Sequence, residues 1–596
     1  MEKELKRSEV DQSLTWDLSP LFKSDEDCLK AMEKIIEEAK KFKEKFSGKI
    51  KTGKDVASLL DEYRKIAEDL NVIDYYIFLG IETDYTNAKK LDMMNKGSSF
   101  QGEFSGILSF IDSELSLLPE NVLEDAVKIS NENKTYIKNI LKNKAYMLDP
   151  KVEETISYLS PVFGNTHTIY SAAINSDLHY PPLKVKDKEY TLTFTGFEGA
   201  LEYDTDTEKR RCAYEKFYNG LKTYENTLAA NYESQMIGQK IFASLRGYKN
   251  VFEYLLSGQD VTEDMYNRQI DIIFNKLAPH MRRYANLIKK IYGLDKMTFA
   301  DLKLPIDPTY KGTVTLEEAK KDILSAISIM GEDYCKFVKE TFDNRRVDYV
   351  QNVGKASGAF CASPYRKGAY ILMSWAGVMA DVYTLAHEAG HAGHFWLSGN
   401  NNNVLDANSV STYFVESPST MHELLLSNYI MKNAKDDRTK RMALSLLVSN
   451  TYYHNFVTHL LEGHFQRKLY HLVQKGESVA PLLSKLKLET LRDFWADAVE
   501  IPEYAGLTWM RQGHYYMGLY SYTYSAGLTV STAASLKIIK GEPNAVEQWK
   551  EALKAGGTLT PLEFAKKAGL DLTTDEPFIQ TIDHIGSLID EIIKLS

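Results

Sequence analysis

One stretch of the chain, residues 384–394, reads Thr384-Leu385-Ala386-His387-Glu388-Ala389-Gly390-His391-Ala392-Gly393-His394. It contains the pattern H-E-x-x-H and follows a helix-forming run. Residues four apart in a helix lie one turn apart on the same face, so the imidazoles of His387 and His391 can bind one metal ion. Neutral imidazole suits zinc. Glu388 points about 100° away, where it can take a proton from water on the metal. The stretch therefore predicts the site of a zinc hydrolase.

A catalytic zinc site needs a third protein ligand, and two downstream glutamates are candidates. Glu416 and Glu423 are seven residues apart, hence on one helical face, so either could bind the metal while the other supports a histidine. The metzincin pattern is excluded, because His394 and Leu397 stand where its glycine and third histidine belong. His394 shares the face of the other two histidines one turn further along. It is either a supporting residue of the cleft or a surface residue.

The composition limits the partners of the chain. Its 596 residues call for two or more lobes, and a net charge of -10 argues against a nucleic acid as the main partner. No apolar run approaches the length needed to cross a bilayer, and no secretory signal is visible at the N-terminus. The four cysteines are far apart and form no metal-binding pair. We expect a cytoplasmic protein without membrane contact.

Glycine and proline are sparse, and helical periodicity recurs along most of the chain, so we expect a mainly α fold. A hairpin is predicted after Pro182, which divides the chain into an N-terminal helical lobe (1–182), a hairpin or linker (183–203) and a catalytic domain (204–596). Two further short strands are predicted within 354–361 and 369–374, just before the zinc-motif helix. They either offer an edge to an extended peptide or merely cap the domain.

The chain resembles the oligoendopeptidase F branch of the thimet oligopeptidase family of zinc peptidases. The resemblance rests on Trp16-Asp17-Leu18-Ser19-Pro20-Leu21, on the His387–His391 motif and on Phe414-Val415-Glu416-Ser417-Pro418-Ser419, and it covers nearly the whole chain. It implies that Glu416 is the third ligand and that Glu423 supports the site. It also implies two helical lobes enclosing a deep channel with zinc at its floor, and cleavage of short peptides.

A tyrosine-rich segment, residues 512–524, resembles the family's His-and-Tyr substrate-binding segment. An aromatic-rich helix is first of all a packing surface, but a zinc hydrolase also needs neutral donors aimed at the developing oxyanion. His514 and Tyr522 are the preferred donors. Tyr515, Tyr516 and Tyr520 are rivals that could instead contact the substrate. The peptide itself is expected to lie extended along Gly358, Ala359 and Phe360.

The combined prediction is a zinc-dependent endopeptidase with one zinc ion per chain, acting on short oligopeptides; the oligomeric state is left open. One alternative is a carboxypeptidase or dipeptidyl carboxypeptidase, which would need a cationic pocket closing one end of the cleft, for which Arg511 is the candidate. Another is an inactive peptide-binding protein, which would need no general base. The remaining histidines of the long helical region are expected to be surface or structural residues without carboxylate partners: His454, His459, His464 and His471.

Overall fold

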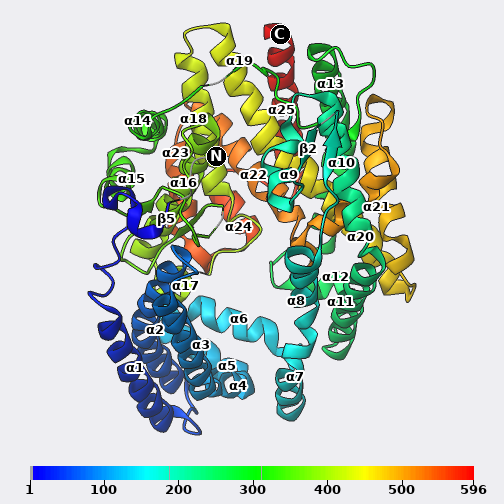
Figure 1. Cartoon of the computed structure of the whole chain (residues 1–596). Helices are drawn as coiled ribbons and strands as arrows, with labels where there is room; N and C mark the ends of the chain where they lie inside the picture. Colours follow the sequence, from blue (N-terminus) through cyan, green and yellow to red (C-terminus); the bar gives the residue numbers. More distant parts are fainter. Residues whose placement is uncertain (1–4, 187, 311, 357, 408) are drawn as a thin grey trace.

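The structure is a computed structural model that describes residues 5–186, 188–310, 312–356, 358–407 and 409–596. These residues form α-helices almost throughout, with two small sheets (Figure 1). The mainly helical fold predicted from the sequence is therefore confirmed. None of the described helices is both long and apolar enough to cross a membrane.

The first helices pack around a group of apolar side chains of their own, which runs from Cys28 to Ile137. The acidic residues after Ser24 begin the first of these helices, and the Ser24 hydroxyl oxygen accepts a hydrogen bond from the Asp27 N–H. In Figure 1 these helices are blue to cyan. They are α1 (Asp25–Phe46), α2 (Gly53–Glu82), α3 (Ala88–Leu108), α4 (Phe110–Leu117), α5 (Glu120–Ile129) and α6 (Lys134–Lys144).

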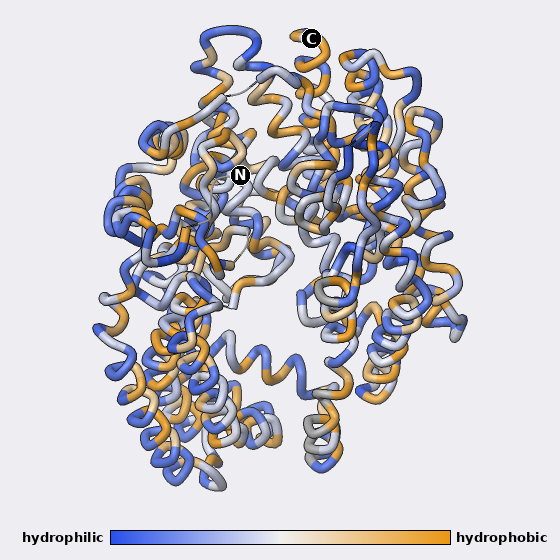
Figure 2. The backbone as a smooth tube through the Cα atoms, viewed as in Figure 1, coloured by the Kyte–Doolittle hydropathy of each residue, from blue (hydrophilic) through white to orange (hydrophobic). Residues whose placement is uncertain are grey.

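A larger apolar cluster extends from Tyr170 to Ile592 and holds most of the remaining helices together. Figure 2 shows apolar and polar positions alternating along these helices, as amphipathic elements around a shared core require. All the helices after α6 are α7 (Pro150–Phe163), α8 (Asn165–Ala172), α9 (Phe194–Gly199), α10 (Thr207–Lys222), α11 (Glu225–Leu245), α12 (Val251–Ser257), α13 (Glu263–Ile291), α14 (Leu316–Ala326), α15 (Glu332–Asp343), α16 (Met379–Asn401), α17 (Val404–Ala407), α18 (Ser417–Asn433), α19 (Asp437–Leu446), α20 (His459–Lys475), α21 (Leu483–Trp495), α22 (Tyr522–Ile539), α23 (Ala545–Lys554), α24 (Pro561–Lys567) and α25 (Glu576–Leu595), of which α7 and α17 lie outside this cluster.

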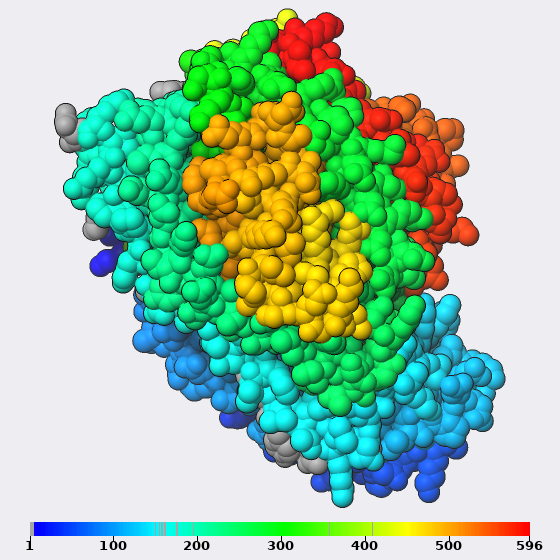
Figure 3. Space-filling model, turned by 90° about the vertical axis from the view of Figure 1, so that its right-hand side faces the viewer, coloured from blue at the N-terminus to red at the C-terminus, as the bar shows by residue number. Residues whose placement is uncertain are grey.

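Segments that are distant in sequence share one surface. Figure 3 shows residues around α21, in yellow to orange, flanked by green residues from the middle of the chain, with red residues from the C-terminal end beyond them. Two short elements also matter for the site. A π-helix, η8 (Leu447–Thr458), precedes α20, and a 3₁₀-helix, η12 (Gly513–Met517), precedes α22.

The hairpin predicted after Pro182 is present. β1 (Leu183–Val185) pairs antiparallel with β2 (Lys188–Tyr190). The second strand ends at Tyr190, because Thr193 soon afterwards caps α9 by accepting a hydrogen bond from the Gly196 N–H at 3.0 Å. The hairpin side chains Leu183 and Val185 belong to the larger apolar cluster. The division of the chain at residues 183–203 stays a prediction.

The second sheet has the strand order β3-β5-β4 and stands beside the zinc-motif helix. The predicted hairpin is formed by β4 (Phe360–Ala362) and β5 (Tyr370–Leu372), which pair antiparallel. β3 (Val347–Asp348) pairs parallel with β5 and was not predicted, because two residues are too few to show a period. β4 is thus an edge strand that packs against α16.

The helix that carries H-E-x-x-H is crossed closely by the helix that follows Glu416. A side-chain carbon on Gly390 would lie 2.3 Å from the carbonyl oxygen of Pro418. One on Gly527 of α22 would lie 3.3 Å from Cβ of Glu416. Gly390 and Gly527 thus let α18 pack closely against both α16 and α22.

Candidate active site

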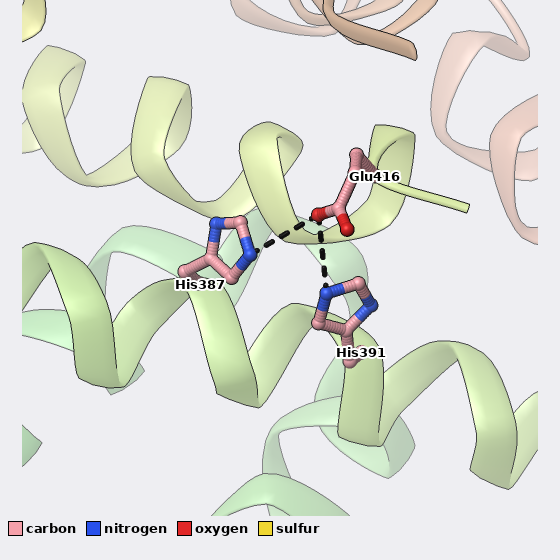
Figure 4. A group of neighbouring side chains, drawn as sticks. All are labelled: His387, His391 and Glu416. Atoms are coloured by element: carbon pink, nitrogen blue, oxygen red, sulfur yellow. Dashed lines mark ion pairs between the residues drawn. The ribbon is translucent and has the colours of Figure 1, made fainter. Parts of the chain in front are cut away.

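Two histidines and a glutamate converge where α16 meets the start of α18 (Figure 4). Oε2 of Glu416 lies 3.2 Å from Nε2 of His387 and 3.3 Å from Nε2 of His391. Glu416 directly precedes α18, and Pro418 occupies the first turn of that helix, where the missing N–H costs nothing. Two imidazole nitrogens and one carboxylate oxygen on adjacent helices form the donor set that zinc prefers, so the side chains fit the ion.

A hydrogen-bond network holds this set in place. Nδ1 of His387 lies 2.7 Å from Oε1 of Glu423, and Thr451 of η8 donates to the other carboxylate oxygen of Glu423. Ser419 donates to Oε2 of Glu416 at 2.9 Å. A carboxylate on Nδ1 directs the lone pair of Nε2 toward the metal position, which is the supporting arrangement found around bound zinc.

Glu388 lies beside the donor set but does not join it. Its side chain is 5% exposed, and its Oε2 has no hydrogen-bond partner among the described residues. Burial raises the pKa of the Glu388 carboxyl above its usual range. Although burial opposes ionisation of Glu416, the neighbouring His391 and His387 hold its pKa well below the usual range. The two glutamates therefore differ in pKa. The raised pKa of Glu388 suits a group that accepts a proton, and the lowered pKa of Glu416 suits a metal ligand.

The site opens into a cavity of about 1020 Å³. His387, Glu388 and Glu416 line one part of it, and Glu202 and Arg511 line another. This volume is at the upper end of the range for pockets that hold small molecules, so the cavity can take a ligand longer than a single amino acid.

The structure does not bring Tyr522 to this cavity. Its side chain is 1% exposed, and its hydroxyl donates to Oε1 of Gln259 at 2.5 Å, on the far side of α22. The ring packs edge-on against Tyr266 at 4.8 Å. This placement does not support the predicted role of Tyr522 as an oxyanion donor, because the hydroxyl is buried in the core and already paired.

Two of the rival tyrosines are also engaged elsewhere. Tyr515 is 1% exposed, and its hydroxyl lies 3.4 Å from Nζ of Lys487. The hydroxyl of Tyr516 accepts a hydrogen bond from Asn231 at 3.0 Å. Neither residue is among those that line the cavity.

Tyr520 and Tyr524 lie near the donor set instead. Burial and the ionised Glu416 raise the pKa of Tyr520. The charge of Glu416 also acts on Tyr524, which lines the cavity. The Tyr520 and Tyr524 rings meet edge-on at 5.5 Å, and His514 lies 5.5 Å from Tyr520 and 5.6 Å from Tyr524. The sequence analysis did not single out Tyr524, which lies in the same tyrosine-rich segment, residues 512–524.

His394, on α16, is completely buried, and neither of its ring nitrogens has a hydrogen-bond partner among the described residues. Burial lowers its pKa to about 3, so the ring is neutral. The prediction that His459 lacks a carboxylate partner is wrong. His459 and Glu462 are three apart on α20, and Nδ1 of His459 lies 2.7 Å from Oε2 of Glu462. His464 stacks on Phe274, in keeping with a structural role.

The expected peptide-binding strand lies next to the zinc-motif helix. Phe360 turns its ring toward Trp16 and Phe78. The next residue, Cys361, faces the other way, close enough to Glu388 for that carboxylate to act on its thiol. Gly358, just before the strand, has a positive φ of 85°, which glycine adopts without strain.

Comparisons with known proteins point to one family. Residues 200–584 match peptidase family M3, and residues 114–180 match the oligopeptidase F family. The chain is 28% identical to oligopeptidase PepF of Bacillus subtilis (strain 168), over 99% of this chain and 88% of that protein. It is 27% identical to an oligoendopeptidase F homolog of Borreliella burgdorferi, over 99% and 100%.

A solved structure shares the fold. The crystal structure of oligoendopeptidase-F from Enterococcus faecium superposes with a TM-score of 0.73 at 22% identity, covering 95% of this chain and 98% of that one. Because the family match spans more than half of the chain and includes its histidine and glutamate donor set, the chain belongs to peptidase family M3, as a metallopeptidase of the oligopeptidase F branch.

Proposed function

We propose that the chain is a zinc-dependent endopeptidase that hydrolyses internal bonds of short, unstructured peptides. The observation that carries the proposal is the convergence of His387, His391 and Glu416, of which His387 and Glu416 line one cavity, with the unpaired carboxylate oxygen of Glu388 beside them. A protein that only binds peptides has no use for such a base, which argues against the inactive alternative.

The three donors would hold one zinc ion per chain. When bound there, zinc supplies Lewis acidity that polarises the scissile carbonyl and lowers the pKa of a water molecule. Glu423 keeps the His387 ring oriented, so that Nε2 faces the metal position.

Glu388 acts as the general base in this proposal. It takes a proton from the attacking water and then passes that proton to the leaving amine. Its raised pKa suits this exchange, because a buried carboxylate holds a proton more readily than an exposed one. Its exclusion from the metal-binding set leaves both carboxylate oxygens available for proton transfer.

His514 and one nearby tyrosine would donate to the oxygen of the attacked carbonyl. Burial and the neighbouring His459 lower the pKa of His514, so the neutral ring can donate an N–H. We assign the tyrosine role to Tyr524, with Tyr520 as its neighbour, because Tyr524 lines the cavity and Tyr522 does not.

The peptide backbone would lie along the edge strand β4, with Gly358 and Ala359 leading into Phe360. An edge strand offers unpaired N–H and C=O groups that recognise any extended peptide regardless of its side chains. We further propose that the cavity is the floor of a channel between two helical lobes. A folded protein could not reach a buried floor with its backbone, whereas a flexible peptide could.

The carboxypeptidase alternative needs a free cation to bind the substrate's terminal carboxylate. Arg511 is the candidate from the sequence, but its guanidinium already has hydrogen-bond partners. It donates to Glu202 at 2.7 Å, to Glu198 at 2.5 Å and to the hydroxyl of Tyr218 at 3.0 Å. Two carboxylates neutralise its charge, so it offers little attraction to a third, which favours the endopeptidase.

An internally quenched peptide that is blocked at both termini tests the proposal. We expect cleavage at an internal bond, loss of activity on chelation, and recovery with zinc. Fragment masses give the position of the cut, and Glu388→Gln is the matched inactive control. Cleavage confined to the C-terminal residues of unblocked peptides would refute the endopeptidase assignment. Digestion of a native folded protein would refute the enclosed channel.

A further inference from the structure

A second group of metal-binding side chain types lies against the cavity, where α20 begins. His459 and Glu462 share a face of this helix, and Nδ1 of His459 lies 2.7 Å from Oε2 of Glu462. The His514 ring, on η12, lies 5.3 Å from the His459 ring. Each of the three residues offers one nitrogen or oxygen atom, and these atoms lie within 4.8 Å of one another.

The donor atoms of this group lie close together, but not all of them have a hydrogen-bond partner. Nδ1 of His514 is buried and has no hydrogen-bond partner among the described residues. His459 is 1% exposed and Glu462 is 2% exposed. A buried imidazole nitrogen without a partner loses its hydration, so it gains from any ligand that accepts its lone pair.

The ring of His459 is also supported on its other side. Its Nε2 lies 3.1 Å from Nε2 of His454, which comes from the π-helix η8. A histidine that binds a metal through one nitrogen usually places its other nitrogen on a fixed partner. The same arrangement exists at the catalytic set, where Glu423 occupies Nδ1 of His387. His459 is thus held in place in the same way as a metal-binding histidine.

We propose that His459, Glu462 and His514 form a second site for a divalent transition metal ion such as zinc. The donor types, two imidazoles and one carboxylate, are those of the catalytic set. Glu462 lines the same cavity as His387, so an ion can enter by the same route. The site is the weaker of the two, because the buried ammonium of Lys487 acts on Glu462 and opposes a second cation there.

Occupancy of this site has a consequence for catalysis that rests on the proposed function. In the proposed function, His514 donates a hydrogen bond to the substrate carbonyl. A metal ion bound to His514 would prevent that hydrogen bond. Excess zinc would then inhibit the enzyme, with the ion on His459 and Glu462 competing against the bound peptide.

Zinc titration of the chelator-stripped full chain tests the site without measuring activity. We expect two phases in competition with a chromogenic chelator, the tighter one lost in His391→Asn and the weaker one lost in His459→Asn. Glu462→Gln should also lose the weaker phase. His464→Asn, one turn further along the same helix, is the matched control and should keep both phases. An intact first phase reports that each variant is folded.

A single phase in the wild-type chain, or a second phase that survives both His459→Asn and Glu462→Gln, would overturn the proposal. The buried His459–Glu462 contact would then be an ordinary structural hydrogen bond. In the peptide assay, excess zinc should reduce wild-type activity at least tenfold more than that of His459→Asn. If a second ion binds without inhibition, the site stands and its link through His514 fails. If no peptide is cleaved, the proposed function fails while the titration still decides the site.

Discussion

Gly390 sets how closely the two metal-binding helices approach each other, so replacing it with alanine should damage the zinc site. The new Cβ would lie 2.3 Å from the carbonyl oxygen of Pro418 and 2.7 Å from Cα of Ser419. Ordinary contacts begin at 3.4 Å. Both neighbours are backbone atoms, which cannot rotate away. Helix α18 must therefore move by about 1 Å, the difference between the normal and the imposed contact.

This movement acts directly on the ligands, because Glu416 directly precedes α18 and Glu423 lies within it. Metal–ligand distances tolerate only about 0.2 Å, so a shift of this size should weaken zinc binding by about 10–100-fold. Overpacking also costs about 1–3 kcal/mol of folding stability, offset by the gain of about 1 kcal/mol for alanine over glycine in a helix. The substitution should thus weaken zinc binding more than it lowers folding stability.

Gly238 provides the matched control for this test. It lies in the interior of α11, and a side-chain carbon there would meet nothing within 4 Å. Gly238→Ala should leave zinc affinity unchanged and raise stability by up to about 1 kcal/mol. Zinc affinity by chelator competition and thermal unfolding of the zinc-free chain check both variants. If Gly390→Ala binds zinc as tightly as Gly238→Ala does, the close crossing does not set the metal geometry.

Four further substitutions separate the roles at the site. Glu388→Gln should keep its zinc while kcat falls by about 10²–10⁴, and loss of metal in this variant would contradict its role as base. Tyr524→Phe should lower kcat by about 10²–10³ without loss of zinc, whereas a wild-type rate would move the role to Tyr520. Tyr522→Phe should keep its rate but lose about 1 kcal/mol of stability, seen as a lower Tm, because only a core hydrogen bond is removed. Glu423→Gln should weaken zinc binding by about 10–100-fold, and unchanged affinity would show that its contact with the histidine does not support the metal.

The metal-binding histidines and the base could be predicted from the sequence because their geometry is local. Within one helix, a spacing of four places His387 and His391 on one face wherever the helix lies, and it places Glu388 beside them. The small Gly390 between the histidines is also visible in the sequence, and it permits the close crossing with α18. The short hairpin of β4 and β5 was predictable for the same reason, since its strands are adjacent in the chain.

The tyrosine donor depended on packing that no local pattern records. Tyr522 and Tyr524 are two residues apart on α22, so they point to nearly opposite sides of the helix. Almost every position of α22 is buried, which leaves no polar face to indicate which side meets the cavity. Contacts with Gln259 and Tyr266 turn Tyr522 into the core and leave Tyr524 toward the site.

The second cluster shows the same division between local and tertiary information. The spacing of three between His459 and Glu462 is visible in the sequence, and their contact on α20 could have been predicted from it. The approach of His514 could not, because it comes from a separate short helix whose position depends on the packing of the surrounding helices. Helical spacing determines which side chains share a face. Only the assembled core decides which faces from distant segments meet.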